Sequence, residues 1–183
     1  MALEATFQEL PPKLMHLRTD LKDLEVFIGD KPQAHKLPDD LGEIVVDLWN
    51  RVDQALEAAL EAQAAVQHPT DLGRARSALA TCQEQFNFVS HRLLTELRSD
   101  RQMAELNRLG RRLGGEWRGW ASSVRQTLEE SHLPLYEVNQ ALFRCWQELT
   151  ERLDTMSVSV QATNIGQQIT APEERAVNEE SLP

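Results

Sequence analysis

Apolar residues recur at alternating spacings of three and four along almost the entire chain, and this pattern constrains the fold more than any other feature. Such a seven-residue repeat places apolar side chains on one face of an α-helix and is typical of helices that pack along a seam. The seams run over residues 14–28, 41–66, 72–97, 103–128 and 135–156. Because the links are short, we expect an all-α, up-down bundle of four long helices with a shorter N-terminal helix packed alongside.

Two of the predicted boundaries leave alternatives open. Pro11 and Pro12 suit the first turn of a helix, so the first long segment is expected to start there. Residues 3–10 keep the apolar spacing and fit a short leading helix. Near Ser99 and Asp100 a weak capping signal predicts a tight turn, with a continuous bent helix as the alternative.

The pattern changes after residue 156. Val158, Val160 and Ala162 alternate with polar residues, which is the period of a β-strand. The segment "APEERAVNEESLP" then carries four glutamates, one arginine and no apolar stripe, as disordered segments do. We therefore expect a bundle domain over residues 1–156 and an extended, then disordered, acidic tail over 157–183. An extended tail of this kind could add a strand to a partner's sheet, with a plain linker as the alternative.

The composition excludes several classes of protein. A net charge of −10 argues against a nonspecific nucleic-acid coat. The two cysteines lie on apolar seams and are expected to be small buried hydrophobes rather than a disulfide framework. No basic, apolar leader precedes the first helix, and no apolar run approaches the roughly 18 residues of a membrane span. We therefore expect a cytoplasmic protein with no membrane contact.

The sequence also lacks the usual signatures of catalysis and metal binding. The five histidines fall on different segments, and the single Glu-x-x-His spacing, Glu129 to His132, lies at a helix end. Ser90 and His91 are adjacent on a helix and therefore point in different directions. No phosphate-binding glycine motif or nucleophile elbow is present. The prediction is a protein without enzymatic activity, metal or cofactor.

The fourth predicted helix reverses the charge of the chain. Between Arg98 and Arg125 there are seven arginines and three carboxylates, a local charge of +4. At about 100° per residue, Arg111, Arg118 and Arg125 form one stripe with Arg108 beside it, opposite the seam that holds Trp117 and Trp120. Nucleic-acid sites that stack bases need aromatic rings on the arginine face, so this geometry disfavours nucleic acid.

The same stretch, "GRRLGGEWRG", holds four glycines, each of which costs about 1 kcal/mol in a helix interior. Gly110 and Gly114 flank the seam and suit a close approach by a neighbouring helix. On a continuous helix, which the spacing favours over a loop, Gly115 and Gly119 fall on the outer face beside the arginines. They indicate either a partner at that face or a kink near Gly114.

The sequence thus predicts a helical adaptor or regulatory protein that binds another protein through the outer face of its fourth helix. The residues expected to form this face are Arg108, Arg111, Gly115, Arg118, Gly119 and Arg125. The expected partner is an acidic protein surface or the glutamate-rich tail, and the alternative is a nucleic acid or phosphate ligand on the same arginines. The long seams, with Trp49 or Trp146 at their edge, are also compatible with a homodimer.

Overall fold

Every secondary-structure element that the computed structural model describes, over residues 2–29 and 40–169, is helical. The all-α class and the bundle packing are therefore as expected. The elements in chain order are α1 (Ala2–Gly29), α2 (Asp40–Ala65), the 3₁₀-helix η1 (Pro69–Asp71), α3 (Leu72–Arg92), the π-helical turn η2 (Leu93–Leu97), α4 (Asp100–Leu113), α5 (Gly115–Glu130) and α6 (His132–Ile169).

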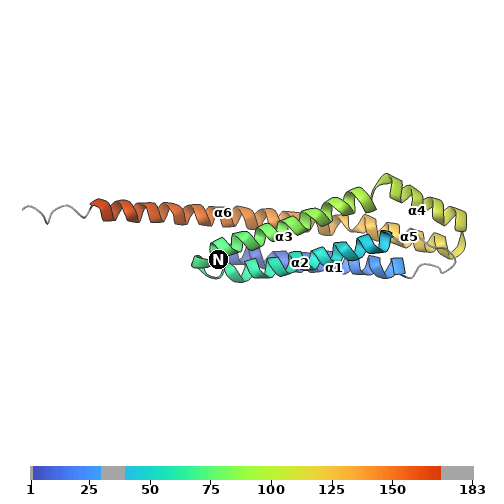
Figure 1. Ribbon diagram of the computed structural model, residues 1–183, viewed down its shortest axis with the longest axis horizontal. Helices are drawn as coiled ribbons and strands as arrows, with labels where there is room; N and C mark the ends of the chain where they lie inside the picture. The colour runs from blue at the N-terminus through green and yellow to red at the C-terminus, as the bar shows by residue number, and fades with distance from the viewer. Residues whose placement is uncertain (1, 30–39, 170–183) are drawn as a thin grey trace, which may run out of the picture.

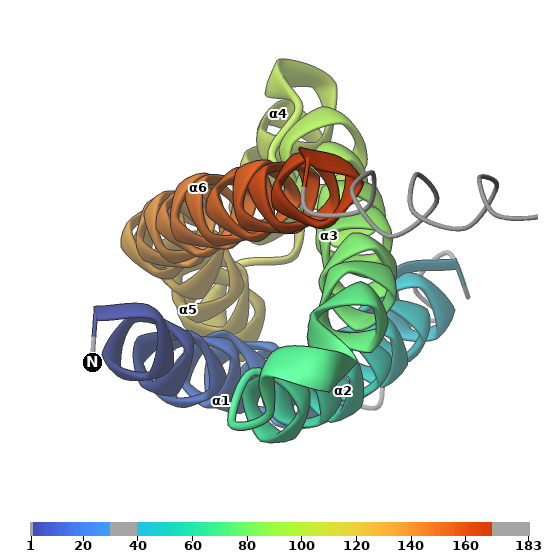
Figure 2. The same cartoon turned by 90° about the vertical axis from the view of Figure 1, so that its left-hand side faces the viewer.

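The bundle consists of four antiparallel rods. Three of them are α1, α2 and α3, and the fourth is made by α5 and α6, which follow each other almost in line with a break at Ser131 (Figure 1). Seen from the end, the four rods surround a common core (Figure 2). The closest packing joins α2 to α3, α1 to α2 and α1 to α6, whereas α4 packs chiefly against α5.

The predicted apolar seams build this core. The eight seam positions of α2 and the eight of α3–η2 are all buried, from Leu41 to Val66 and from Leu72 to Leu97. Trp117 and Trp120 are buried as expected, with 5% and 8% of their surfaces exposed, and Cys82 and Cys145 are completely buried. The period of the sequence was therefore a sound guide to which side chain faces inward.

The first helix differs from the expectation of a short, peripheral element that starts after the prolines. α1 is continuous through Pro11 and Pro12 and forms a full rod of the bundle. An interior proline costs about 3 kcal/mol because it removes a backbone hydrogen bond. Phe7 and Leu10 are completely buried on the same seam as Leu14, and burial of such side chains contributes about 1.5–3 kcal/mol each. Their burial offsets the cost of the prolines.

The predicted turn at Ser99 is confirmed, and the bent continuous helix is not. Ser99 caps α4, because its hydroxyl accepts a hydrogen bond of 3.2 Å from the backbone N–H of Gln102. Before this cap, η2 widens the helix by one residue, and the N–H of Arg98 donates to the carbonyl of Leu93. A π-helical turn of this kind marks where a helix leaves its regular path.

The fourth predicted helix is not continuous, and this is the main correction to the sequence analysis. The chain reverses at Gly114 and Gly115, whose φ angles are +63° and +47°, so α4 and α5 form a helical hairpin. Residues with a Cβ rarely adopt such backbone angles. Gly114, with ψ −164°, occupies a region of backbone conformation that is almost exclusive to glycine. Two of the four glycines that looked costly in a helix, Gly114 and Gly115, are therefore the residues that interrupt it.

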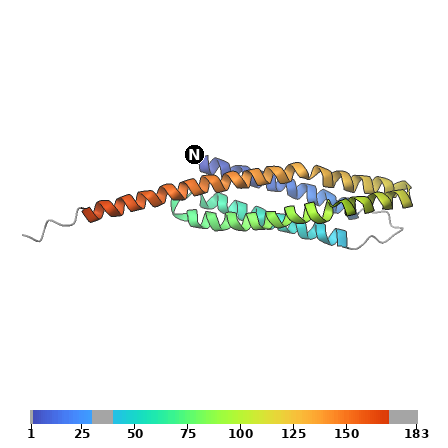
Figure 3. The ribbon, with the colours of Figure 1, turned by 90° about the horizontal axis from the view of Figure 1, so that it is seen from above.

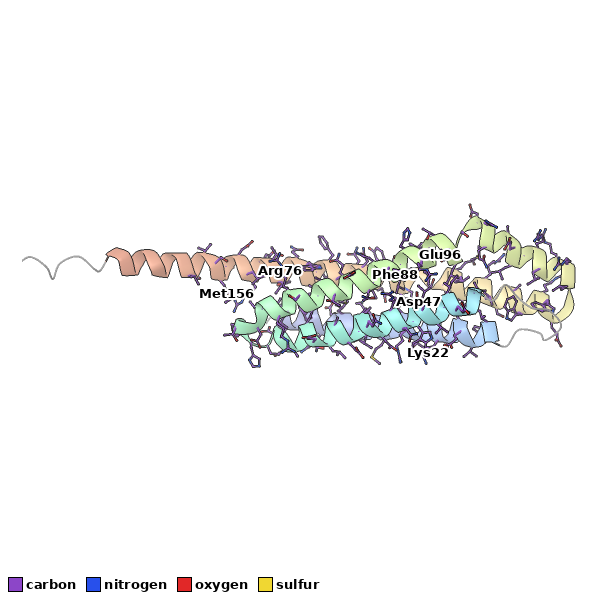
Figure 4. The ribbon with its side chains drawn as sticks, viewed as in Figure 1. Lys22, Asp47, Arg76, Phe88, Glu96 and Met156 are labelled. Atoms are coloured by element: carbon purple, nitrogen blue, oxygen red, sulfur yellow. The ribbon has the colours of Figure 1, made fainter. Side chains whose placement is uncertain are left out.

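The extended conformation predicted after residue 156 is also wrong for residues 157–169. α6 continues as a helix to Ile169 and projects beyond the other rods (Figures 1 and 3). Met156, labelled in Figure 4, still packs partly on the core. Val158 and Val160 are both well exposed. Extending an existing helix costs far less than starting a new element, and no strand among the described residues offers a partner. The predicted disordered segment, residues 170–183, lies outside the described residues.

The backbone angles at the hairpin turn lead to a first prediction. Gly114→Ala should lower the free energy of unfolding by about 1–3 kcal/mol, because alanine is strained at that φ and ψ. Gly119→Ala is the matched control: Gly119 is helical and exposed, and a Cβ there meets no atom within 4 Å. That control should instead raise stability by about 0.4–1 kcal/mol. Urea denaturation followed by circular dichroism measures both, and equal effects would contradict the proposed turn.

Candidate functional site: the arginine face of the hairpin

The α4–α5 hairpin projects beyond the ends of α1 and α2 (Figure 1). Its two helices are brought close together at Gly110, where an added Cβ would lie 3.3 Å from the Cα of Arg118 and 3.4 Å from the Cβ of Ala121. Trp120 ties the hairpin to the bundle, because its Nε1 donates a hydrogen bond of 2.6 Å to the carbonyl oxygen of Phe27 in α1. The hairpin is therefore tied to α1 through the half of α5 that lies nearer the turn.

The reversal brings together three of the predicted site residues from two different helices. Arg111 of α4 lies across a shallow groove of about 240 Å³ from Arg118 and Arg125 of α5. Asn107 and Ser122 also line this groove and supply polar groups between the guanidinium groups. The sequence analysis placed these arginines on one stripe of a single helix; in the structure they share a groove because the helix folds back.

Arg108 and the neighbouring Arg112 belong to the other side of α4. They line a larger groove of about 820 Å³, which is bounded by the start of α2, by η2 and by α4. Five apolar side chains line this groove: Leu41, Ile44, Leu97, Leu106 and Leu109. The site predicted from the sequence did not include Arg112 or this groove. The groove lies between α2 and α4, which are far apart in the sequence.

The two predicted glycines lie in different surroundings. Gly115 is part of the turn, and its role is to allow a positive φ. Gly119 is exposed on α5, and a Cβ at that position would meet no atom within 4 Å among the described residues. We define the arginine face of the hairpin as Arg108, Arg111, Arg112, Arg118 and Arg125, without the glycines.

Most of these arginines lack a partner among the described residues, unlike several arginines of the bundle. Arg108, Arg111, Arg112 and Arg118 are exposed, and none forms an ion pair or hydrogen bond with a described residue. Only Arg125 is engaged, through Glu129 at 3.3 Å and the side-chain oxygen of Asn107 at 3.4 Å. Arg125 and Glu129 are four residues apart, the spacing at which side chains of opposite charge pair on a helix.

Arg92 shows how a bundle arginine is used instead. Its guanidinium group contacts Asp47 of α2 at 2.8 Å and Glu96 of η2 at 3.0 Å, and it lies over the ring of Phe88 (Figure 4). Its hydrogen bonds to Glu96, together with the charges of Glu96 and Asp47, raise its pKa above the ordinary value. Other arginines are paired in the same way between helices, as in Arg18–Asp53, Arg74–Glu61 and Arg144–Glu9. These pairs link rods of the bundle, whereas four of the five arginines of the arginine face form no such pair with a described residue.

The aromatic residues of the hairpin face the core. The rings of Trp117 and Trp120 pack edge to face, with centroids 5.5 Å apart and an interplanar angle of 74°. Both are buried, and the Nε1 of Trp120 is already committed to Phe27. No aromatic ring of the hairpin is thus exposed beside the arginines as a platform for a base.

The described residues offer little for catalysis or metal binding. They contain no group of three or more His, Cys, Asp or Glu side chains that could hold a metal ion. Burial raises the pKa of the Cys82 and Cys145 thiols to about 12, so both remain protonated and unreactive near neutral pH. The cysteines are buried hydrophobes, as the sequence predicted.

Comparison with protein-family models, with curated proteins and with solved structures finds no significant match to this chain. None of the helices, over the part of the chain that the structure describes, combines the length and hydropathy needed to cross a bilayer. The function proposed below therefore rests on the exposed residues of the chain itself.

The buried cysteines give a second prediction. Raising a thiol pKa from 9.0 to about 12 lowers the thiolate fraction about a thousandfold at pH 8. Both thiols should therefore react with a disulfide reagent at least about 100-fold more slowly in the folded protein than in urea. The free energy of unfolding should be insensitive to these thiols below pH ~9, the pKa of an ordinary thiol, and should fall as pH rises above it. Rapid labelling of the folded protein would contradict their burial.

Proposed function

We propose that this protein is a non-enzymatic binding module whose α4–α5 hairpin docks onto an acidic segment of another protein. The observation that carries the proposal is the set of four exposed, unpaired arginines on the hairpin. Several arginines of the bundle form ion pairs between rods, so carboxylates are available as partners elsewhere in the fold. Guanidinium groups held on a rigid scaffold and left without a partner are suited to bind carboxylates from outside.

The charge distribution supports an acidic partner. The stretch from Arg98 to Arg125 carries a net charge of +4, although the whole chain carries −10. The helices Asp100–Leu113 and Gly115–Glu130 together carry six arginines and five carboxylates, so the positive charge is local. It is concentrated in Arg108, Arg111, Arg112 and Arg118 around the turn, where an acidic segment would be attracted. Such a contrast steers a partner to one place and suppresses contacts elsewhere.

A phosphate or nucleic-acid ligand on the same arginines is less well supported. The tryptophans that alternate with the arginines in the sequence are buried, so single-stranded bases find no stacking platform on this face. The acidic remainder of the chain would also repel an extended polyanion that reaches beyond the hairpin.

The proposal leads to a third prediction, tested with a fluorescein-labelled amphipathic helix rich in glutamate and leucine. Wild-type protein should bind this probe at low salt, and the glutamine version of the probe should bind far more weakly. Arg111→Glu/Arg118→Glu should weaken binding by at least about tenfold, equivalent to roughly 1.4 kcal/mol. Fluorescence anisotropy measures each affinity.

The matched control is Arg76→Glu/Arg152→Glu, which makes the same change in net charge on α3 and α6, away from the hairpin. This control should bind the probe like the wild type. An equal loss of affinity in both variants would show that only the net charge of the protein matters, and would overturn the proposed site. A labelled DNA duplex and a single strand are measured in parallel, and preference for either over the acidic probe would favour the nucleic-acid alternative.

A further inference from the structure

The chain itself contains an acidic segment that could bind the hairpin. Residues 170–183 carry four glutamates, at positions 173, 174, 179 and 180, against the single Arg175. This acidic segment is complementary to the four unpaired arginines of the hairpin. It also follows directly after α6, so the position of Ile169 determines where the segment can reach.

The geometry prevents the acidic segment from reaching the hairpin of its own molecule. α6 begins at the base of the hairpin and runs away from it, past the far end of the bundle (Figures 1 and 3). Its 38 residues span about 57 Å at 1.5 Å per residue. The fourteen residues after Ile169 span at most about 50 Å when fully extended.

The arginines lie even farther away than the base of the hairpin. α5 has 16 residues, so the turn at Gly114 lies about 24 Å beyond that base. Arg111, Arg112 and Arg118 are all within four residues of Gly114 or Gly115. The acidic segment therefore falls short of them by tens of ångströms, and contact within one molecule is excluded.

We propose that residues 170–183 of one molecule bind the arginine face of the α4–α5 hairpin on a second copy of the chain. This inference rests on the proposed function, since it names the acidic segment that the hairpin takes. The end of α6, from which residues 170–183 follow, and the hairpin lie at opposite ends of the elongated molecule (Figure 1). A contact between two different surfaces of identical chains is heterologous, so it joins molecules head to tail.

The strong net charge makes the hairpin the site of this association. Two copies that each carry −10 repel one another wherever acidic surfaces meet. Attraction is expected where the acidic segment meets the four exposed arginines around the turn of the hairpin. Exposed charges make the contact, so it is expected to be weak, dependent on concentration and sensitive to salt.

The test uses full-length protein and sedimentation velocity over a range of concentrations at low salt. The wild type should show a sedimentation coefficient that rises with concentration, and this rise should disappear at about 1 M salt, where charges are screened beyond roughly 3 Å. Arg111→Glu/Arg118→Glu should lose the rise, and so should Glu173→Lys/Glu174→Lys/Glu179→Lys. The far Arg76→Glu/Arg152→Glu control should keep it.

Mixing the two charge-reversed variants gives the sharpest outcome. The first variant has an acidic hairpin and an acidic segment, and the second has a basic hairpin and a basic segment. Neither should associate with itself, but an equimolar mixture should regain the concentration-dependent rise, because each hairpin now meets a segment of opposite charge. Recovery in the mixture cannot come from misfolding or from net charge alone.

Two results would overturn the inference. One is a wild type that stays monomeric at every concentration at low salt, and the other is association that persists in both charge-reversed variants. If the wild type is monomeric while the acidic probe still binds through Arg111 and Arg118, the proposed function stands and only the self-association fails. If the wild type neither self-associates nor binds the acidic probe, both proposals fail together.

Discussion

The left-handed backbone at Gly114 and Gly115 decides the architecture of this bundle. A helix from Asp100 to Glu130 without a break would be a long rod of its own. Because the chain reverses after Leu113, α5 instead returns along the bundle and continues into α6, and together they form the fourth rod beside α1. The reversal also leaves α4 without a place among the four rods, so the hairpin extends from the end of the bundle (Figure 1).

The sequence predicts the core of this molecule well and its connections poorly. The seams of α2 and α3 were predicted position by position, because burial on a helix repeats with the period that the sequence shows. The reversal at Gly114 was missed for a related reason: Leu113, Trp117 and Trp120 keep the helical spacing across the turn, so the seam gives no sign of a break. A signal was present, however, since two glycines after Arg111 and Arg112 match the usual end of a helix.

The errors at the two ends of the chain come from local rules that packing overrides. Pro11 and Pro12 predict a break, but Phe7 and Leu10 are buried on the same seam as Leu14, and the helix continues. Val158 and Val160 alternate like a strand, but the helix that precedes them simply extends. The candidate site is intermediate: its arginines were identified from charge and spacing, whereas the grooves they line depend on tertiary contacts that no local pattern encodes.

The strength of the exposed charges limits what the arginine face can do by itself. An exposed ion pair contributes about 0.2–1 kcal/mol, so four such contacts give about 1–4 kcal/mol, while a millimolar affinity already needs about 4.1 kcal/mol. The arginines are therefore suited to selecting and orienting a partner rather than to holding it tightly. A tighter complex would need apolar contacts as well, and the groove lined by Leu41, Ile44 and Leu109 lies directly beside Arg108 and Arg112. The segment 170–183 contains few large apolar side chains, so its affinity for a second copy is limited. An acidic partner with more apolar side chains could therefore displace it.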